Sequence, residues 1–332
     1  MRALATPPLS AVDPKTLLPA YGSYRGSLRR SDLGPLAGDG VSKVLREKRW
    51  VWCSITQEDL MIALAVVDLG YASNGFAYAY VPGRGLVAHA SVVGLPRLSR
   101  VKQTATRRID ARLRDPRLGI RITHEDHDPQ LEVALRSSTL ELNATLDTRQ
   151  APPPITAIAP LEQGVVDVTE KRVLMGVRGS ALVAGRRLSL DGALGGYDFS
   201  HGLMPRHTKW NWAFFMGRAA TGAPIAANVV RGWTREHECA VWTQSEVHGV
   251  AEAAFAYDPA RPSADWKITT PDGALDLVLT PGAIHTEEKD LGVVRSAFKQ
   301  AVGRYQGAVV IDGTRHAIED AIGVAEEQDV VW

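Results

Sequence analysis

The sequence predicts an all-β protein of barrel or sandwich architecture with very little helix. Apolar and polar residues alternate with a period of two in several short segments on both sides of a proline-rich stretch, as expected of strands with one buried face. The chain of 332 residues contains 30 glycines, and turn signals separate the alternating segments. Convincing helical spacing occurs in one place only. Many short strands with glycine-rich turns favour closed or sandwiched β-sheets over layered α/β folds.

The first half of the chain supplies an irregular lead-in followed by strands. Residues 1–40 carry repeated prolines and glycines that interrupt any period, so we expect an irregular segment there. The β pattern begins near Lys48. Segments 109–114, 131–135 and 140–147 each alternate apolar with polar residues, and they therefore predict strands that bury one face.

The second half of the chain shows the same alternation. Residues 275–279 alternate after a Pro-Asp-Gly turn at 271–273, and residues 307–311 run into Asp-Gly at 312–313, a strong hairpin signal. Residues 294–305 instead carry apolar side chains at helical spacing, so we expect the single helix there.

A proline-rich stretch at 150–164 marks the predicted domain boundary. Prolines cannot donate to a strand ladder, so this stretch suits a crossing between sheets. We therefore expect one β domain over residues 41–160 and a second over 165–332. A faint duplication crosses the boundary, because 49–52 (Arg-Trp-Val-Trp) and 209–212 (Lys-Trp-Asn-Trp) each place two indoles on one face of a strand. Tandem domains would explain this match, and so would chance.

Composition argues against several function classes. Thirty-eight basic and 37 acidic residues give a net charge of +1 without a basic patch, so we expect no nucleic-acid partner. The longest apolar run, residues 61–67, falls far short of the roughly 20 residues that span a bilayer, and residues 1–15 show no secretory signal. Two cysteines, Cys53 and Cys239, fit a reducing cytosol. We expect a neutral, soluble, cytoplasmic protein of bacterial type, with its oligomeric state left open.

Three short motifs that resemble cofactor or metal sites are better interpreted as ordinary structure. Residues 83–88 match a dinucleotide-binding fingerprint, but a strand pattern follows where a helix is required, which favours a hairpin turn. Residues 124–128 gather five potential metal ligands in one extended segment, where they cannot converge on one ion, and we interpret them as a hairpin tip. Residues 237–239 lack the second histidine of a zincin helix. We expect no metal and no cofactor.

The segment 195–216 is the best candidate for a functional site. If residues 208–216 are extended, their large apolar side chains share one face, beginning with Trp210 and Trp212. A row of large rings beside a loop with polar side chains would form an apolar chamber of the kind that holds small molecules. The polar candidates in that loop are Asp198, His201 and Arg206. A core strand with a structural ion pair between the aspartate and the arginine explains the same pattern, and both interpretations stay open.

The order of several of these residues resembles the bacterial domain-of-unknown-function family 2804. In the second half, the matching residues are Thr169-x-Lys171, Gly185-Arg186, Asp198 with Gly202, Pro205, Thr208-x-Trp210-x-Trp212 and Asn228. Similar matches occur at the opening, 45–50, and at the ending, 303–307, 312–313, 323–327 and Trp332. The resemblance covers roughly residues 40–332 and brings no established activity.

More remotely, the layout is similar to that of carotenoid hydratases, tocopherol cyclases and fungal pericyclase-type proteins. Those proteins have two tandem lipocalin-like (calycin-like) β domains and act on, or carry, hydrophobic polycyclic or isoprenoid molecules without redox cofactors. The resemblance implies the same paired fold and a hydrophobic small-molecule ligand here. The chain departs from the compact His- and Trp-rich stretch of the hydratases at residues 197–212, so carotenoid hydration itself is not implied.

Three functional hypotheses follow: a cofactor-independent hydratase, cyclase or isomerase, a non-catalytic carrier of a hydrophobic ligand, and a packed β scaffold for protein contacts. An enclosed carboxyl group should have a raised pKa and so keep a proton that it can donate to an alkene or carbonyl. The candidate catalytic residues are Asp198, His201 and Glu326. The candidate ligand-binding residues are Arg206 and Asn228, which would orient the ligand, and Trp210 and Trp212, which would form the wall.

Overall fold

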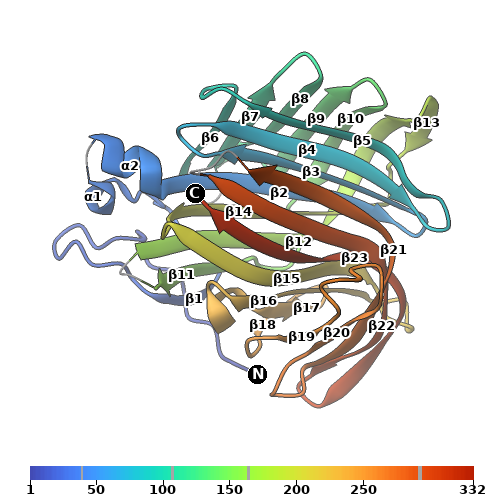
Figure 1. Cartoon of the computed structure of the whole chain (residues 1–332). Coiled ribbons are helices and arrows are strands. Elements are labelled where there is room, and N and C mark those ends of the chain that lie inside the picture. Colours follow the sequence, from blue (N-terminus) through green and yellow to red (C-terminus); the bar gives the residue numbers. More distant parts are fainter. Residues whose placement is uncertain (39, 106–107, 163–164, 291–293) are drawn as a thin grey trace.

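The computed structural model describes residues 1–38, 40–105, 108–162, 165–290 and 294–332 and consists mainly of two antiparallel β-sheets (Figure 1). Each sheet curls into a half-barrel, and the two are consistent with tandem calycin-like domains. The all-β prediction is confirmed. Within the described residues, no helix has the length and apolar character needed to cross a membrane.

The first sheet contains 14 strands in the order β5-β4-β3-β2-β14-β12-β10-β9-β8-β7-β6, while β11 pairs with β1 and β12, and β13 pairs with β12. The strands are β1 (Gly22–Arg25), β2 (Glu47–Gln57), β3 (Leu60–Asp68), β4 (Ser73–Val81), β5 (Gly85–Gly94), β6 (Ser99–Ala105), β7 (Arg108–Arg114), β8 (Leu118–His124), β9 (Gln130–Ser137), β10 (Leu140–Asp147), β11 (Ile155–Leu161), β12 (Val165–Val183), β13 (Arg186–Ser189) and β14 (Leu194–Leu203). The alternation predicted at 109–114, 131–135 and 140–147 is confirmed, because buried and more exposed residues alternate along β7, β9 and β10.

The second sheet contains nine strands in the order β18-β17-β16-β15-β23-β22-β21-β20-β19. The strands are β15 (His207–Arg218), β16 (Pro224–Gly232), β17 (Ala240–Trp242), β18 (Val247–Gly249), β19 (Ala254–Ala256), β20 (Trp266–Thr269), β21 (Leu275–Asp290), β22 (Arg295–Ile311) and β23 (Thr314–Val331). Three long neighbouring strands, β21 to β23, form the red part of the ribbon in Figure 1.

Strand β3 is buried on both faces, and this explains the continuous apolar run at 61–67. Ile62, Leu64 and Val66 belong to the core inside the first sheet. Met61, Ala63 and Ala65 belong to a second core, which the first sheet shares with the second sheet. A strand with both faces covered needs no alternation of apolar and polar residues, so its sequence is a continuous apolar run.

The described residues contain two short α-helices and one 3₁₀ turn, which are α1 (Gly34–Ala37), α2 (Gly40–Arg46) and η1 (Arg235–Glu238). The helix predicted at 294–305 is wrong, because residues 295–305 belong to β22, which pairs with β21 and β23. Neighbouring residues Ala301 and Val302 are both buried, so the two faces of β22 are apolar in its middle. Apolar residues that serve opposite faces of a strand then imitate the spacing of a helix.

The change from one sheet to the other occurs between β14 and β15, at residues 204–206. The proline run at 152–154 instead precedes β11, which still belongs to the first sheet. The predicted domain boundary at 160–165 stays a prediction, and the sheet boundary lies about forty residues later along the chain. The turns predicted at 83–88, 124–128 and 312–313 are confirmed as hairpin connections between β4 and β5, β8 and β9, and β22 and β23.

Gly303 on β22 allows a close approach of β21 that a methyl group would block. A Cβ atom at Gly303 would lie 2.1 Å from the main-chain oxygen of Thr280 and 2.8 Å from Cα of Pro281. Gly176 on β12 has no heavy atom within 4 Å of the same position. We therefore expect Gly303→Ala to lower the free energy of unfolding by roughly 1–3 kcal/mol, and Gly176→Ala to change it by less than about 1 kcal/mol. Urea unfolding measures both, and equal effects would contradict the β21–β22 register.

Candidate functional site

A cavity of about 370 Å³ lies where the two sheets face each other, and most of its lining is apolar. Strands β2, β3, β4 and β14 contribute from the first sheet, and β15, β21, β22 and β23 contribute from the second. Six of the eight tryptophans line it: Trp50, Trp52, Trp210, Trp212, Trp233 and Trp332. A cavity between packed sheets with a few polar groups in an apolar wall has the usual composition of a small-molecule site.

The two Trp-x-Trp strands meet across the interface between the sheets. Residues two apart on a strand share a face, so β2 presents Trp50 and Trp52 together and β15 presents Trp210 and Trp212 together. The rings of Trp50 and Trp210 are stacked with their centroids 6.4 Å apart. The rings of Trp52 and Trp212 meet edge to face with centroids 5.1 Å apart. The indoles therefore form a wall that belongs to both sheets.

Glu326 on β23 places a buried carboxyl group in this wall. Trp210 Nε1 donates to its Oε1 at 2.9 Å, and Gln300 Nε2 donates to its Oε2 at 2.8 Å. Tyr78 Oη donates in turn to the Gln300 side-chain oxygen at 2.6 Å, which fixes the orientation of that amide. Burial raises the pKa of Glu326 to about 7 against the lowering effect of the two donors. Close to half of the Glu326 carboxyl groups therefore carry a proton at neutral pH.

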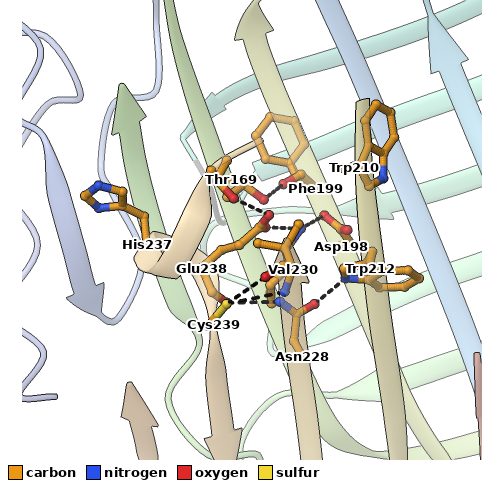
Figure 2. A network of polar contacts seen from close by, with 12 residues as sticks. Thr169, Asp198, Phe199, Trp210, Trp212, Asn228, Val230, His237, Glu238 and Cys239 are labelled. Atoms are coloured by element: carbon orange, nitrogen blue, oxygen red, sulfur yellow. Dashed lines mark hydrogen bonds and ion pairs between the residues drawn. The ribbon is translucent and has the colours of Figure 1, made fainter. Parts of the chain in front are cut away.

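Asp198 on β14 lines the same cavity but has a charged partner. Its carboxylate forms an ion pair with Lys171 of β12, and Lys171 also contacts Glu238 of η1 at 2.7 Å. Figure 2 shows Asp198 and Glu238 directed toward the same place between the strands. Burial raises the pKa of Asp198 to about 6, opposed by the positive charge of Lys171. At neutral pH Asp198 is therefore mostly ionised, in contrast to Glu326.

Lys171 keeps its charge although it is buried. Burial lowers the pKa of an ammonium group, but the negative charges of Asp198 and Glu238 have the larger effect. Together they raise the Lys171 pKa above its ordinary value. Asp167, a third carboxyl group on the cavity wall, is 1% exposed, and its Oδ1 has no hydrogen-bond partner among the described residues. Burial, together with the nearby Glu238, raises the Asp167 pKa well above its ordinary value.

Four of the seven residues singled out from the sequence line the cavity: Asp198, Trp210, Trp212 and Glu326. Asn228 lies behind the wall, where it accepts a hydrogen bond from Trp212 Nε1 at 2.7 Å and donates to the Glu238 main-chain oxygen at 3.0 Å (Figure 2). In this position Asn228 orients the Trp212 indole, whereas the sequence suggested contact with a ligand.

His201 and Arg206 lie outside the cavity lining. The segment expected to be a loop is strand β14, and residues three apart on a strand point to opposite faces, so His201 is directed away from Asp198. His201 Nε2 contacts Glu47 Oε1 at 2.9 Å, and burial lowers the His201 pKa. Arg206 donates to the main-chain oxygen of Trp332. The ion-pair partner of Asp198 is Lys171, where the sequence suggested Arg206.

Lys171 and Gln300 are the important cavity residues that the sequence did not identify as site residues. Each lies opposite an acid in the strand pairing, Lys171 opposite Asp198 and Gln300 opposite Glu326. Lys171 stands between Glu170 and Arg172, and Gln300 follows Lys299, so no local pattern marks either residue, and the strand pairing is what brings them to the acids. Among the residues that the structure describes, no three His, Cys, Asp or Glu side chains are arranged to hold a metal ion.

The family model DUF2804, described as a domain of unknown function, matches residues 5–332. No curated protein matches the sequence. Among solved structures, kievitone hydratase from Nectria haematococca is similar at 14% identity and a TM-score of 0.51, over 90% of this chain and 93% of that chain.

Two further solved structures share the architecture. CghA with Sch210972 is similar at 10% identity and a TM-score of 0.53, over 86% of this chain and 88% of that one. A putative AttH from Nitrosomonas europaea is similar at 13% identity and a TM-score of 0.51, over 90% and 96% of the two chains. These likenesses establish a shared fold over nearly the whole length.

The raised pKa of Glu326 makes a prediction about stability. The folded protein holds a proton on Glu326 up to about pH 7, whereas the unfolded chain loses this proton near pH 4.5. The contribution of this group to stability is therefore fully present below pH 4.5 and is lost as the pH rises through 7. We expect Glu326→Gln to reduce the fall in unfolding free energy between pH 5 and pH 8 by roughly 3 kcal/mol.

Urea unfolding at the two pH values measures this difference. Glu319→Gln is the matched control, because Glu319 lies exposed on the same strand, and we expect it to leave the pH dependence unchanged. A Glu326→Gln variant with the pH dependence of the unsubstituted protein would show that Glu326 ionises normally in the folded state.

Proposed function

Because the chain belongs to the DUF2804 family and encloses an indole-lined cavity, we propose that it binds a hydrophobic small molecule of lipid or isoprenoid type and protonates it from Glu326. The observation that carries this proposal is the Glu326 carboxyl itself, which is buried in the cavity wall with a pKa of about 7. A general acid works best when its pKa lies near the working pH, and burial in an apolar site is the usual means of raising a carboxyl pKa that far.

The proposed chemical step is proton transfer to an alkene carbon or a carbonyl oxygen of the ligand. With an alkene, the π-electron pair forms the new C–H bond, the O–H bond of Glu326 breaks, and a carbocation is left beside the Glu326 carboxylate. Addition of water followed by loss of one of its protons completes a hydration, attack by a second double bond followed by proton loss from the new cation completes a cyclisation, and direct loss of a neighbouring proton completes an isomerisation. The faces of Trp50, Trp52 and Trp212 supply cation–π stabilisation to the positive charge.

Asp198 has a different part in this proposal from the one considered for it on the sequence alone. A carboxylate paired with Lys171 is mostly ionised at neutral pH and is therefore a poor acid. It is instead suited to accept the proton that an isomerisation or cyclisation releases, or to stabilise a cation by its charge. Two carboxyl groups whose surroundings separate their pKa values form an acid and base pair.

The structural relatives are compatible with this proposal. By its name, one relative is a hydratase of kievitone, and another was solved with the small molecule Sch210972. Both share the fold of this chain, and the structure of the second with its small molecule indicates that a protein of this fold can hold one. The packed-scaffold hypothesis predicted no cavity, and the cavity described above argues against it.

A non-catalytic carrier remains the second candidate. It is favoured by the hydrogen bonds to both oxygens of Glu326, because an acid held by Trp210 and Gln300 also serves as a static part of a binding wall. The carrier and the enzyme differ in one respect: only the enzyme moves a proton between Glu326 and the ligand.

Proton transfer can be tested once native mass spectrometry of freshly purified protein has identified a retained lipid or terpenoid. Incubation of that molecule with the protein in D₂O should place deuterium on its carbon skeleton. Loss of a positioned general acid costs on the order of 10²–10⁴-fold in rate, so Glu326→Gln should slow incorporation by that factor while binding stays near normal. Glu319→Gln should behave like the unsubstituted protein. Binding without deuterium incorporation would establish the carrier and refute the acid role of Glu326.

Asp198→Asn separates the base role from the acid role. This change removes the carboxylate but nearly keeps the shape of the side chain. We therefore expect deuterium incorporation into the substrate to survive, while formation of product by proton loss from the cation slows at least tenfold. The ratio of deuterated substrate to product, measured by mass spectrometry, reports the difference. Loss of both activities together would assign the acid role to Asp198 instead.

A further inference from the structure

We propose that the cavity holds a second polar subsite, formed by Glu287 and Lys289 of β21 with Asn74 of β4, that binds a hydroxyl group of the ligand. The proposal rests on the proposed function, since it assumes an apolar molecule in the same cavity, and it names the class of that molecule as an apolar alcohol or phenol. All three residues line the cavity.

The strand register places this subsite away from Glu326. Glu287 pairs with Phe298 and Lys289 pairs with Ser296 on β22, whereas Glu326 receives its hydrogen bond from Gln300 of the same strand. Phe298 and Ser296 lie two and four residues before Gln300, so Glu287 and Lys289 are about 7 and 13 Å from the Gln300 register at about 3.3 Å per residue. The Phe298 ring lines the cavity between Ser296 and Gln300. The cavity therefore offers two separated polar positions joined by an apolar stretch.

One oxygen of Glu287 is satisfied and the other is not. Lys289 Nζ donates to Glu287 Oε2 at 2.6 Å, and Asn74 Nδ2 donates to the same oxygen at 3.3 Å. Glu287 Oε1 has no hydrogen-bond partner among the described residues, although the side chain is only 7% exposed. A buried acceptor without a donor is costly. Oε1 is enclosed in this structure, so a ligand donor in the cavity that Glu287 lines would reach it after a small shift of this side chain and would then remove the cost.

No described residue donates a hydrogen bond to Glu287 Oε1. His285 Nε2 lies 3.9 Å away, which is too long for a hydrogen bond, and this nitrogen also has no partner among the described residues. Burial lowers the His285 pKa to about 4, so the ring is neutral at physiological pH and does not compete for the carboxylate as a cation.

A hydroxyl group fits this arrangement better than other polar groups. The Lys289 ammonium has three N–H donors, and the described contacts use two of them, to Glu287 and to Asn74 Oδ1 at 3.4 Å. A ligand hydroxyl can donate to Glu287 Oε1 and accept from Lys289 at the same time. An ether or ketone cannot donate to Glu287, and a carboxylate would face it with the same charge.

The test compares farnesol with farnesyl methyl ether, in which a methyl group replaces the hydroxyl hydrogen and the oxygen can accept but not donate a hydrogen bond. Their dissociation constants can be measured by intrinsic fluorescence, because six tryptophans line the cavity. We expect the unsubstituted protein to bind farnesol roughly tenfold or more tightly than the ether, the effect of a hydrogen bond to a charged group. The more apolar ether would be preferred if burial alone decided the affinity.

The double variant Glu287→Met/Lys289→Met removes both charges together, so neither is left buried without its partner. We expect it to bind the ether about as well as the unsubstituted protein does, which also establishes that it folds, and to lose the preference for farnesol. Glu287→Gln, a smaller change that leaves a neutral acceptor, should reduce the preference partly. Lys267→Met/Asp276→Met removes an exposed ion pair of the same sheet and should leave the preference unchanged.

The outcomes separate the subsite from the proposed function. Equal affinities for the two probes in the unsubstituted protein, or a farnesol preference that survives in the double variant, would overturn the subsite and leave apolar binding intact. Failure of the unsubstituted protein to bind either probe would overturn the proposed function and the subsite together.

Discussion

The packing of two tryptophan pairs across the sheet interface determines much of the rest of this structure. Trp50 against Trp210 and Trp52 against Trp212 hold β2 and β15 face to face. Indoles bury a large apolar area, but each also brings an N–H group that needs a partner inside the protein. Glu326 accepts from Trp210 and Asn228 accepts from Trp212. Two of the buried polar groups here, Glu326 and Asn228, thus serve the wall itself by accepting from its indoles.

The strand register gives the two sheets equivalent arrangements around these pairs. Trp52 lies opposite Asp198 in the first sheet, and Trp212 lies opposite Glu326 in the second. On the other side of each acid lies a polar residue, Lys171 beside Asp198 and Gln300 beside Glu326. The faint sequence duplication around the Trp-x-Trp segments therefore extends to their neighbouring strands. A lysine in one copy and a glutamine in the other explain why Asp198 is mostly ionised and Glu326 is about half protonated at neutral pH.

Sequence patterns predicted the β architecture well because strands with one solvent face alternate visibly, as in 140–147. They failed at 294–305, because both faces of β22 are buried around residues 300–303 and the alternation disappears there. For the site, Trp210, Trp212 and Glu326 were identified from local sequence or resemblance, but Lys171 and Gln300 depend on which strands pair. His201 was grouped with Asp198 by closeness in sequence, although strand geometry directs them to opposite faces.

The central claim is that this wall raises the pKa of Glu326 to about 7, so that about half of these carboxyl groups carry a proton at neutral pH. A direct titration of that carboxyl group tests it. The infrared band of protonated carboxyl groups can be followed against pH, and the contribution of Glu326 is the part that disappears in Glu326→Gln. The structure predicts that this contribution has a midpoint near pH 7. A midpoint near the ordinary value of 4.5 would contradict the account, because Glu326 would then be fully ionised in the cavity and unable to act as an acid.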